Sequence, residues 1–259
     1  MNENLLENIR IVLVEPAGAL NVGSIARVMK NMGLTRLVLV NPRCDRHSES
    51  ARIMAVHAVD VLENAVIVDS LPKALAGCQK AIATTVRSRS VPIKLEPAPV
   101  VLPWLLTSDV ESAILFGAED RGLSNDELKY AQRFVCISSN PDYPSLNLAQ
   151  AVGICAYELY QTWLRINNSP LQSTIPAPPV VEEPKPTNAP IDVLEGYYQH
   201  LEDVLLEIGY LHPHTVPVKM EKFRRLYNKA NLQPEEVAML RGILRQVRWA
   251  IKNSESESV

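Results

Sequence analysis

The chain has 259 residues, of which 47% are hydrophobic and 21% are charged, and its formal net charge is −3 at pH 7. This composition is typical of an ordinary globular protein of one or two domains, and it excludes a strongly basic chain that binds nucleic acid through its overall field. No apolar run approaches the roughly 18 residues of a membrane span, the first ten residues lack the basic region of a signal peptide, and the four cysteines lack CxxC spacing, so we expect a cytoplasmic protein with reduced thiols and no metal site.

The first 165 residues alternate between short apolar runs and helical patterns. Runs rich in Val and Ile predict strands at residues 9–14, 36–40, 65–68, 80–85, 112–117 and 134–137. Helical spacing between them predicts helices at residues 21–33, 50–62, 71–77, 98–107, 124–131 and 146–165. Ser70 and Ser124 are the expected N-caps of two of these helices, the second in a capping box with Glu127. Apolar strands that alternate with helices predict an α/β fold with a parallel sheet covered on both faces.

A proline-rich segment follows this α/β domain, which we place at residues 1–166. Residues 167–190 hold seven prolines in 24 positions, which excludes a helix or a central strand and predicts an extended linker. Beyond it, a small all-helical domain is expected at residues 191–253. Helical spacing covers residues 192–208 and 219–251, and Pro234 divides the second stretch into one helix that ends near residue 230 and another that begins near 234. The last residues, 254–259, are predicted to be disordered.

Charge is distributed unevenly along this helical tail. Residues 191–215 hold five acidic residues and no Lys or Arg, whereas residues 216–253 hold nine Lys and Arg against three Glu. The net charge of +6 in the second segment fits either a solvated helix surface or contact with phosphates.

The first motif is EPAGALNVGSIAR at residues 15–27, directly after the strand expected at 9–14. A glycine-containing loop between a strand and a helix often holds a phosphate or a nucleotide. Gly18, Gly23 and Ser24 nearly have P-loop spacing, but the Lys that precedes the Ser in a P-loop is missing, and the loop does not fit GxGxxG either. The usual nucleotide-binding patterns are therefore excluded.

Two further motifs follow predicted strands in the same way. ILFGAEDRGLSNDEL (residues 114–128) has a strand that ends at Gly117, and CISSNPDYPSLNLAQAVGICAYELY (136–160) has one that ends at Ile137. Open α/β sheets bind ligands at the carboxyl ends of their strands. All three motifs are therefore expected to contribute to one site.

NVGSIAR (21–27), FGAEDRGLS (116–124) and NPDYPSLNLAQAV (140–152) resemble, in this order, the three motifs of the SPOUT class of RNA 2′-O-ribose methyltransferases, and the resemblance covers residues 9–165. It implies an α/β knot fold, in which the C-terminal strand, loop and helix form a deep trefoil knot. It also implies S-adenosylmethionine (AdoMet) as the methyl donor, bound in the knot loops, and a homodimer in which two subunits complete the site.

The tail carries a second resemblance. MEKFRRLYNKANLQPEEVAMLRGILRQVRWA (220–250) is similar to the C-terminal helical extension of the TrmJ-type tRNA methyltransferases. That group modifies cytidine or uridine at nucleotide 32 of the anticodon loop. The resemblance therefore implies a tRNA-binding extension on a tRNA methyltransferase.

The resemblance also assigns a set of residues to the AdoMet pocket: Thr84, Thr85, Val86, Gly117, Ile137, Pro144, Ser145 and Leu146. Three of these residues have a simpler structural explanation. Ile137 and Leu146 could be core residues, and Gly117 could be a backbone turn that has no room for a Cβ. Pro144 has no N–H to donate, so the pocket cannot depend on a backbone donor there.

By resemblance, the catalytic residues are Arg27 and Asn21. As alternatives to a catalytic role, Arg27 could be an ordinary surface Arg and Asn21 could be a helix N-cap. Arg27 is a poor general base because its pKa lies above about 12. We therefore expect it to hold a substrate phosphate and to stabilise the developing alkoxide, with a phosphate taking the proton.

Two more residues have supporting roles in this interpretation. Glu119 is expected to be structural or to bridge the dimer, with pairing to Arg121 or to main chain as its alternative, and Asn147 is expected to cap or orient the helix of the third motif. The candidate RNA contacts are Arg87, Arg89, Arg224, Arg225 and Arg245, with Lys94 in the loop at 86–97.

Other functions remain open at this point. The substrate could be ribosomal RNA or another tRNA position, or the chain could be an RNA-binding module without catalysis. A binding module would have little need for the full set of Asn21, Arg27, Gly117, Ser145 and Asn147.

Overall fold

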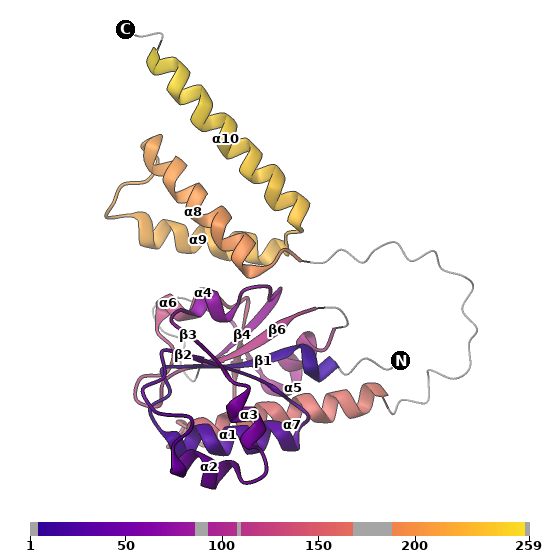
Figure 1. Cartoon of the computed structure of the whole chain (residues 1–259). Helices are drawn as coiled ribbons and strands as arrows, with labels where there is room; N and C mark the ends of the chain where they lie inside the picture. Colours follow the sequence, from indigo (N-terminus) through magenta and orange to yellow (C-terminus); the bar gives the residue numbers. More distant parts are fainter. Residues whose placement is uncertain (1–4, 86–92, 108–109, 168–187, 257–259) are drawn as a thin grey trace, which may run out of the picture. The chain divides into compact units, whose positions relative to one another are not determined.

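The computed structural model describes residues 5–85, 93–107, 110–167 and 188–256. The chain divides into two compact units, residues 1–184 and 185–259 (Figure 1). The division falls within the proline-rich segment at 167–190, most of which lies outside the described residues. Within the described ranges, no helix has the length and hydropathy needed to cross a membrane.

The first unit is built on a seven-stranded sheet in the order β3-β2-β1-β6-β4-β7-β5, and every pair of neighbouring strands is parallel. The inner strands β1 and β6 are almost fully buried, as their mainly apolar sequences predict. The strands are β1 (Ile9–Val14), β2 (Arg36–Val40), β3 (Val66–Val68), β4 (Lys80–Thr84), β5 (Leu95–Pro97), β6 (Ser112–Phe116) and β7 (Arg133–Cys136).

Helices cover both faces of this sheet, as predicted. In Figure 1, α1, α2, α3 and α7 lie on one side of the sheet, and α4 and α6 lie on the other. The helices of this unit are η1 (Leu5–Asn8), α1 (Ala19–Asn31), α2 (Glu49–Ala55), α3 (Val59–Glu63), α4 (Leu71–Ala74), α5 (Ala98–Val101), η2 (Leu102–Leu105), α6 (Asn125–Leu128) and α7 (Leu148–Asn167). The trefoil knot stays a prediction of the family resemblance.

The predicted strands agree with the structure to within one residue at each end, but several other details differ. The helix expected at 98–107 is divided into α5 and the 3-10 helix η2, and the helices expected at 71–77 and 124–131 end at Ala74 and Leu128. β5 is missing from the prediction, and the helix expected at 50–62 is divided at Val56, which has a φ of 54°. Ser124 and Glu127 form the predicted capping box, whereas Ser70 precedes α4 without a side-chain capping bond. Ser70 thus occupies the predicted N-cap position of α4, but without the hydrogen bond of a side-chain cap.

The second unit consists of three helices, α8 (Ile191–Glu207), α9 (Val216–Ala230) and α10 (Pro234–Ser256). Its core is rich in tyrosine: Tyr197 is 1% exposed and its ring meets the edge of Tyr227 at 5.2 Å between centroids. α10 continues to Ser256, so it includes three residues of the segment that the sequence predicts to be disordered, while residues 257–259 lie outside the described range.

Candidate functional site

A cavity of about 430 Å³ opens at the carboxyl ends of β4, β6 and β7. It is formed by the loop after each of these strands and by the start of α7, as expected for ligand sites in parallel α/β sheets. The lining residues are Thr84, Thr85, Phe116, Gly117, Ala118, Glu119, Asp120, Arg121, Gly122, Leu123, Val135, Ile137, Pro144, Ser145, Leu146, Leu148 and Ala151.

Seven of the eight residues assigned to the cofactor by resemblance line this cavity, and Val86 lies outside the described residues. Glu119, which the sequence interpretation gave a supporting role, also lines the cavity, and most of the other lining residues were not predicted. Several of them are buried apolar side chains next to the motifs, such as Phe116, Val135 and Leu148, and their apolar character alone could not distinguish a cavity wall from ordinary core.

Position 117 must be a glycine because the backbone at Gly122 and Leu123 lies where a side chain would be. A Cβ at this position would lie 2.1 Å from the carbonyl carbon of Gly122 and 2.2 Å from the nitrogen of Leu123. The return is a tight turn in which the Gly122 N–H donates to the Ala118 carbonyl at 2.8 Å, and Gly122 has a φ of 67°. The structure thus gives Gly117 the simpler role, a backbone approach that excludes a side chain, and this approach shapes the cavity.

Glu119 connects the first motif to the second. Its carboxylate accepts hydrogen bonds from the N–H groups of Ala17 and Gly18, at 2.9 and 3.0 Å, and from Nδ2 of Asn21 at 3.0 Å. The expected alternative of main-chain pairing therefore describes Glu119. Burial raises the pKa of Glu119, but the hydrogen bonds that it accepts outweigh burial, and the net pKa lies below its ordinary value.

Asn21 continues this network to the third motif. Its Oδ1 accepts a hydrogen bond from Nδ2 of Asn147 at 3.0 Å. Asn147 in turn accepts from the N–H of Ala149 at 2.9 Å and so caps α7, as expected. The three motifs are thus joined by hydrogen bonds through Glu119, Asn21 and Asn147, although about 100 residues separate the first motif from each of the others.

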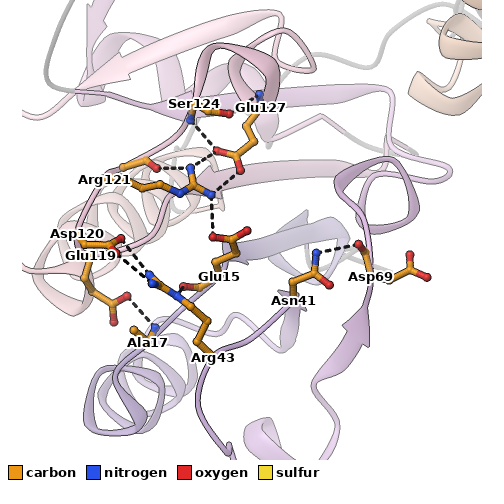
Figure 2. Close-up of polar contacts among 11 residues, drawn as sticks. Glu15, Ala17, Asn41, Arg43, Asp69, Glu119, Asp120, Arg121, Ser124 and Glu127 are labelled. Atoms are coloured by element: carbon orange, nitrogen blue, oxygen red, sulfur yellow. Dashed lines mark hydrogen bonds and ion pairs between the residues drawn. The ribbon is translucent and has the colours of Figure 1, made fainter.

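A second set of contacts holds the loop of the second motif from outside the cavity (Figure 2). Arg121 donates to both carboxylate oxygens of Glu127 at 2.8 Å and to Glu15 at 3.0 Å. Arg43 forms a bidentate pair with Asp120, at 2.9 and 3.0 Å. These pairs fix residues 120 and 121, which line the cavity, to the ends of β1 and β2.

Arg27, the other residue expected to be catalytic, lies outside the cavity. It is exposed on α1 and is not among the residues that line the cavity. It comes six positions after Asn21, which at about 100° per residue places it roughly 240° around the helix. The structure therefore brings Asn21 to the cavity edge and leaves Arg27 on another face of the same helix.

The candidate RNA contacts have different environments. Arg224 is only 12% exposed and pairs with Glu195 through two bonds of 2.5 and 2.6 Å, so the structure does not support its expected contact with phosphate. Arg225 and Arg245 are exposed, and Lys94 approaches Glu96 at 3.8 Å. Arg87 and Arg89 lie outside the described residues.

The cavity fits a nucleoside cofactor in size and chemistry. Its volume lies in the range of about 300–1,000 Å³ that is usual for pockets of small molecules and cofactors. Ile137, Leu146 and Leu148 provide apolar surface for a base. Among the described residues, no group of three or more His, Cys, Asp or Glu could hold a metal ion.

Comparisons with known proteins show the family to which the chain is related. The profile of the SpoU rRNA Methylase family matches residues 8–157, and that of the tRNA methyltransferase TrmJ, C-terminal domain, matches residues 192–257. The tRNA (cytidine/uridine-2′-O-)-methyltransferase TrmJ of Cronobacter sakazakii is 44% identical over 245 residues, which cover 94% of this chain and 97% of that protein. The Escherichia coli K12 protein of the same name is 40% identical over 98% of this chain and all of its own length.

A solved structure is also similar over both units. The crystal structure of TrmJ from Z. mobilis ZM4 matches with a TM-score of 0.78 and 32% identity, and the match covers 92% of this chain and 98% of that one.

Proposed function

The chain belongs to the SpoU rRNA Methylase family and to its TrmJ group, and we propose that it transfers a methyl group from AdoMet to the 2′-OH of a ribose in tRNA, at cytidine or uridine 32 of the anticodon loop. The observation that supports this best is the cavity at the carboxyl ends of β4, β6 and β7, because residues of the second and third motifs line it and Asn21 of the first motif is hydrogen-bonded to its wall.

We assign the cofactor to this cavity. The residues that line it and are assigned to the cofactor include Thr84, Thr85, Gly117, Ile137, Ser145 and Leu146. Pro144 contributes its ring, and its carbonyl already accepts a bond from Ser139 at 3.0 Å. AdoMet, when bound, supplies a methyl group on a sulfonium that is already activated for in-line attack.

The protein then has to align the ribose and to manage charge. The 2′-oxygen forms a bond to the methyl carbon as the bond from carbon to sulfur breaks, and the 2′-OH proton leaves. We assign Asn21, which is held by Glu119 and Asn147, to the ordering of the site. Arg27 holds the phosphate next to the target ribose, stabilises the negative charge that develops on the 2′-oxygen, and leaves the proton to a phosphate oxygen.

A homodimer explains how Arg27 reaches a site. Arg27 lies outside the cavity of its own chain, so we propose that a second copy completes each site. Exposed apolar side chains on two helices that pack together support this arrangement: Leu20 on α1 is 56% exposed, and Ile154 and Tyr157 on α7 are 37% and 50% exposed.

We assign the helical unit to tRNA outside the anticodon loop. A segment with seven prolines connects it to the catalytic unit, and a tether makes its contact with the same tRNA effectively intramolecular. The cytoplasm, where tRNA is processed, is the proposed location.

The test uses purified protein, labelled AdoMet, a pool of unmodified tRNA transcripts and, in a separate reaction, unmodified ribosomal RNA. Methylated positions are mapped by their resistance to alkaline cleavage, with Arg27→Ala in parallel. One resistant position in the anticodon loop, absent with Arg27→Ala, is the expected result. Label on ribosomal RNA alone, or a wild-type chain that binds AdoMet and methylates no RNA, would refute the proposal.

A further inference from the structure

Three arginines lie on one face of α10. Arg241, Arg245 and Arg248 follow one another at intervals of four and three residues, so they lie on one face of α10, and we call them the arginine row. α10 packs beside α8. Nη1 of Arg241 lies 3.8 Å from the place where a Cβ on Gly196 would be, and Arg248 donates to Glu207 at 2.8 Å. The row therefore runs along α8.

The members of the arginine row differ in how their charges are satisfied. Arg248 is paired with Glu207 and approaches Asp203 at 4.0 Å. Arg241 and Arg245 are exposed, and no ion pair or hydrogen bond within the described residues engages them. Glu195, one of the two acids on the first half of α8, is already held by Arg224 from α9. Two guanidinium groups are thus left without a counter-ion.

His200 on α8 lies against this uncompensated charge. It is one turn beyond Gly196, over which Arg241 extends, and it is partly buried. Burial lowers the pKa of His200, and the three arginines of the row lower it further, against the opposite effect of Asp203. The charges near the imidazole are therefore mainly positive, and an excess of positive charge attracts an anion.

We propose that Arg241 and Arg245 of α10, with His200 of α8 beside them, form a binding site for a phosphodiester of the RNA backbone. Two unpaired guanidinium groups on adjacent turns match phosphate oxygens in charge and in donor geometry. His200 adds a third donor. Gly196 keeps the α8 side of the site open because it has no side chain. The site rests on the proposed function, since it assumes that the substrate is tRNA.

The test measures binding of an unmodified tRNA transcript to the full chain over a range of KCl concentrations. The variants are Arg241→Gln and Arg245→Gln, alone and together. Removal of a phosphate contact lowers the slope of log K against log salt by about one. We expect each single variant to do so, and the double variant to raise Kd about tenfold or more at 150 mM salt.

Lys222→Gln is the matched control, because Lys222 is an exposed cation on α9 of the same unit and no ion pair within the described residues engages it. It should leave the slope near that of the wild type. His200→Glu is a second variant that keeps the fold: its carboxylate can pair with the arginines, so the thermal midpoint should not fall, while tRNA binding should weaken. AdoMet affinity in every variant reports on the fold of the first unit.

Wild-type slopes in the Arg241→Gln and Arg245→Gln variants would overturn the site, as would an equal loss in Lys222→Gln, which would indicate a diffuse charge effect. A wild-type chain that neither binds nor methylates tRNA would refute the proposed function itself, and the assignment of this site to RNA with it.

Discussion

The return of the backbone over Gly117 allows a sharp prediction about the cavity. In a Gly117→Ala variant the new Cβ would meet the backbone of Gly122 at 2.1 Å, and real Cβ contacts essentially never fall below 3.0 Å. The loop at 118–123 must therefore retreat by about 1 Å, and backbone cannot swing aside as a flexible side chain does. Overpacking of this kind costs about 1–3 kcal/mol of folding stability.

The same shift displaces a wall of the cavity, because residues 118–123 line it. We expect AdoMet affinity to fall at least tenfold and methyl transfer to fall by about 100-fold, since a displacement near 1 Å in an aligned site has that order of effect. The assays are calorimetry with AdoMet and single-turnover methylation of tRNA.

Gly23→Ala is the matched control for this variant. Its Cβ would meet the carbonyl oxygen of Ala51 at 2.1 Å, so it produces a similar clash between α1 and α2, away from the residues that line the cavity. It should lower the thermal midpoint to a similar extent and leave AdoMet affinity near that of the wild type. Equal AdoMet affinities in the two variants would refute the reasoning.

Three further predictions concern other contacts. Glu119→Gln should destabilise the first unit by about 1–3 kcal/mol at neutral pH, because three hydrogen bonds lose their charged acceptor. The pKa of Glu119 is lowered in the folded chain, so the difference in stability between the variant and the wild type should shrink as pH falls below the ordinary value of 4.5. Denaturant titrations that show the same difference at every pH would contradict this prediction. Arg224→Gln should lower the free energy of unfolding of the helical unit by about 3–5 kcal/mol in chemical denaturation, because it leaves the largely buried carboxylate of Glu195 unpaired. A second substitution, Glu195→Gln, should restore part of this stability. An unchanged denaturation midpoint in Arg224→Gln would show that the pair is exposed in solution. Tyr157→Glu should convert a dimer to a monomer in light scattering, and a variant with the wild-type mass would place the interface elsewhere.

Most of the sheet could be predicted from the sequence because its strands are short, mainly apolar segments that alternate with helical patterns, as in a parallel sheet covered on both faces. β5 could not, because Leu95, Glu96 and Pro97 form a three-residue edge strand without such a run. The division of the helix at 50–62 was equally hidden, since Val56 adopts a positive φ that β-branched residues rarely take.

The site was predictable only where residues follow strands within a motif. The pairs of Arg43 with Asp120 and of Arg121 with Glu15 join residues 77 and 106 positions apart, and no local pattern encodes them. A count of charges in the tail likewise cannot distinguish an arginine that is paired within the protein from one that is exposed. It identifies Arg224 and Arg245 as equally basic, but only packing reveals that Glu195 neutralises Arg224.

The central claim is that the 2′-OH of nucleotide 32 is the methyl acceptor, and a tRNA with a single 2′-deoxy substitution at that nucleotide tests it most directly. The account predicts that the wild-type chain transfers labelled methyl groups to unmodified tRNA and none to the substituted tRNA, although both bind with similar affinity. Equal label on the two tRNAs would contradict it, because the acceptor would then be another atom.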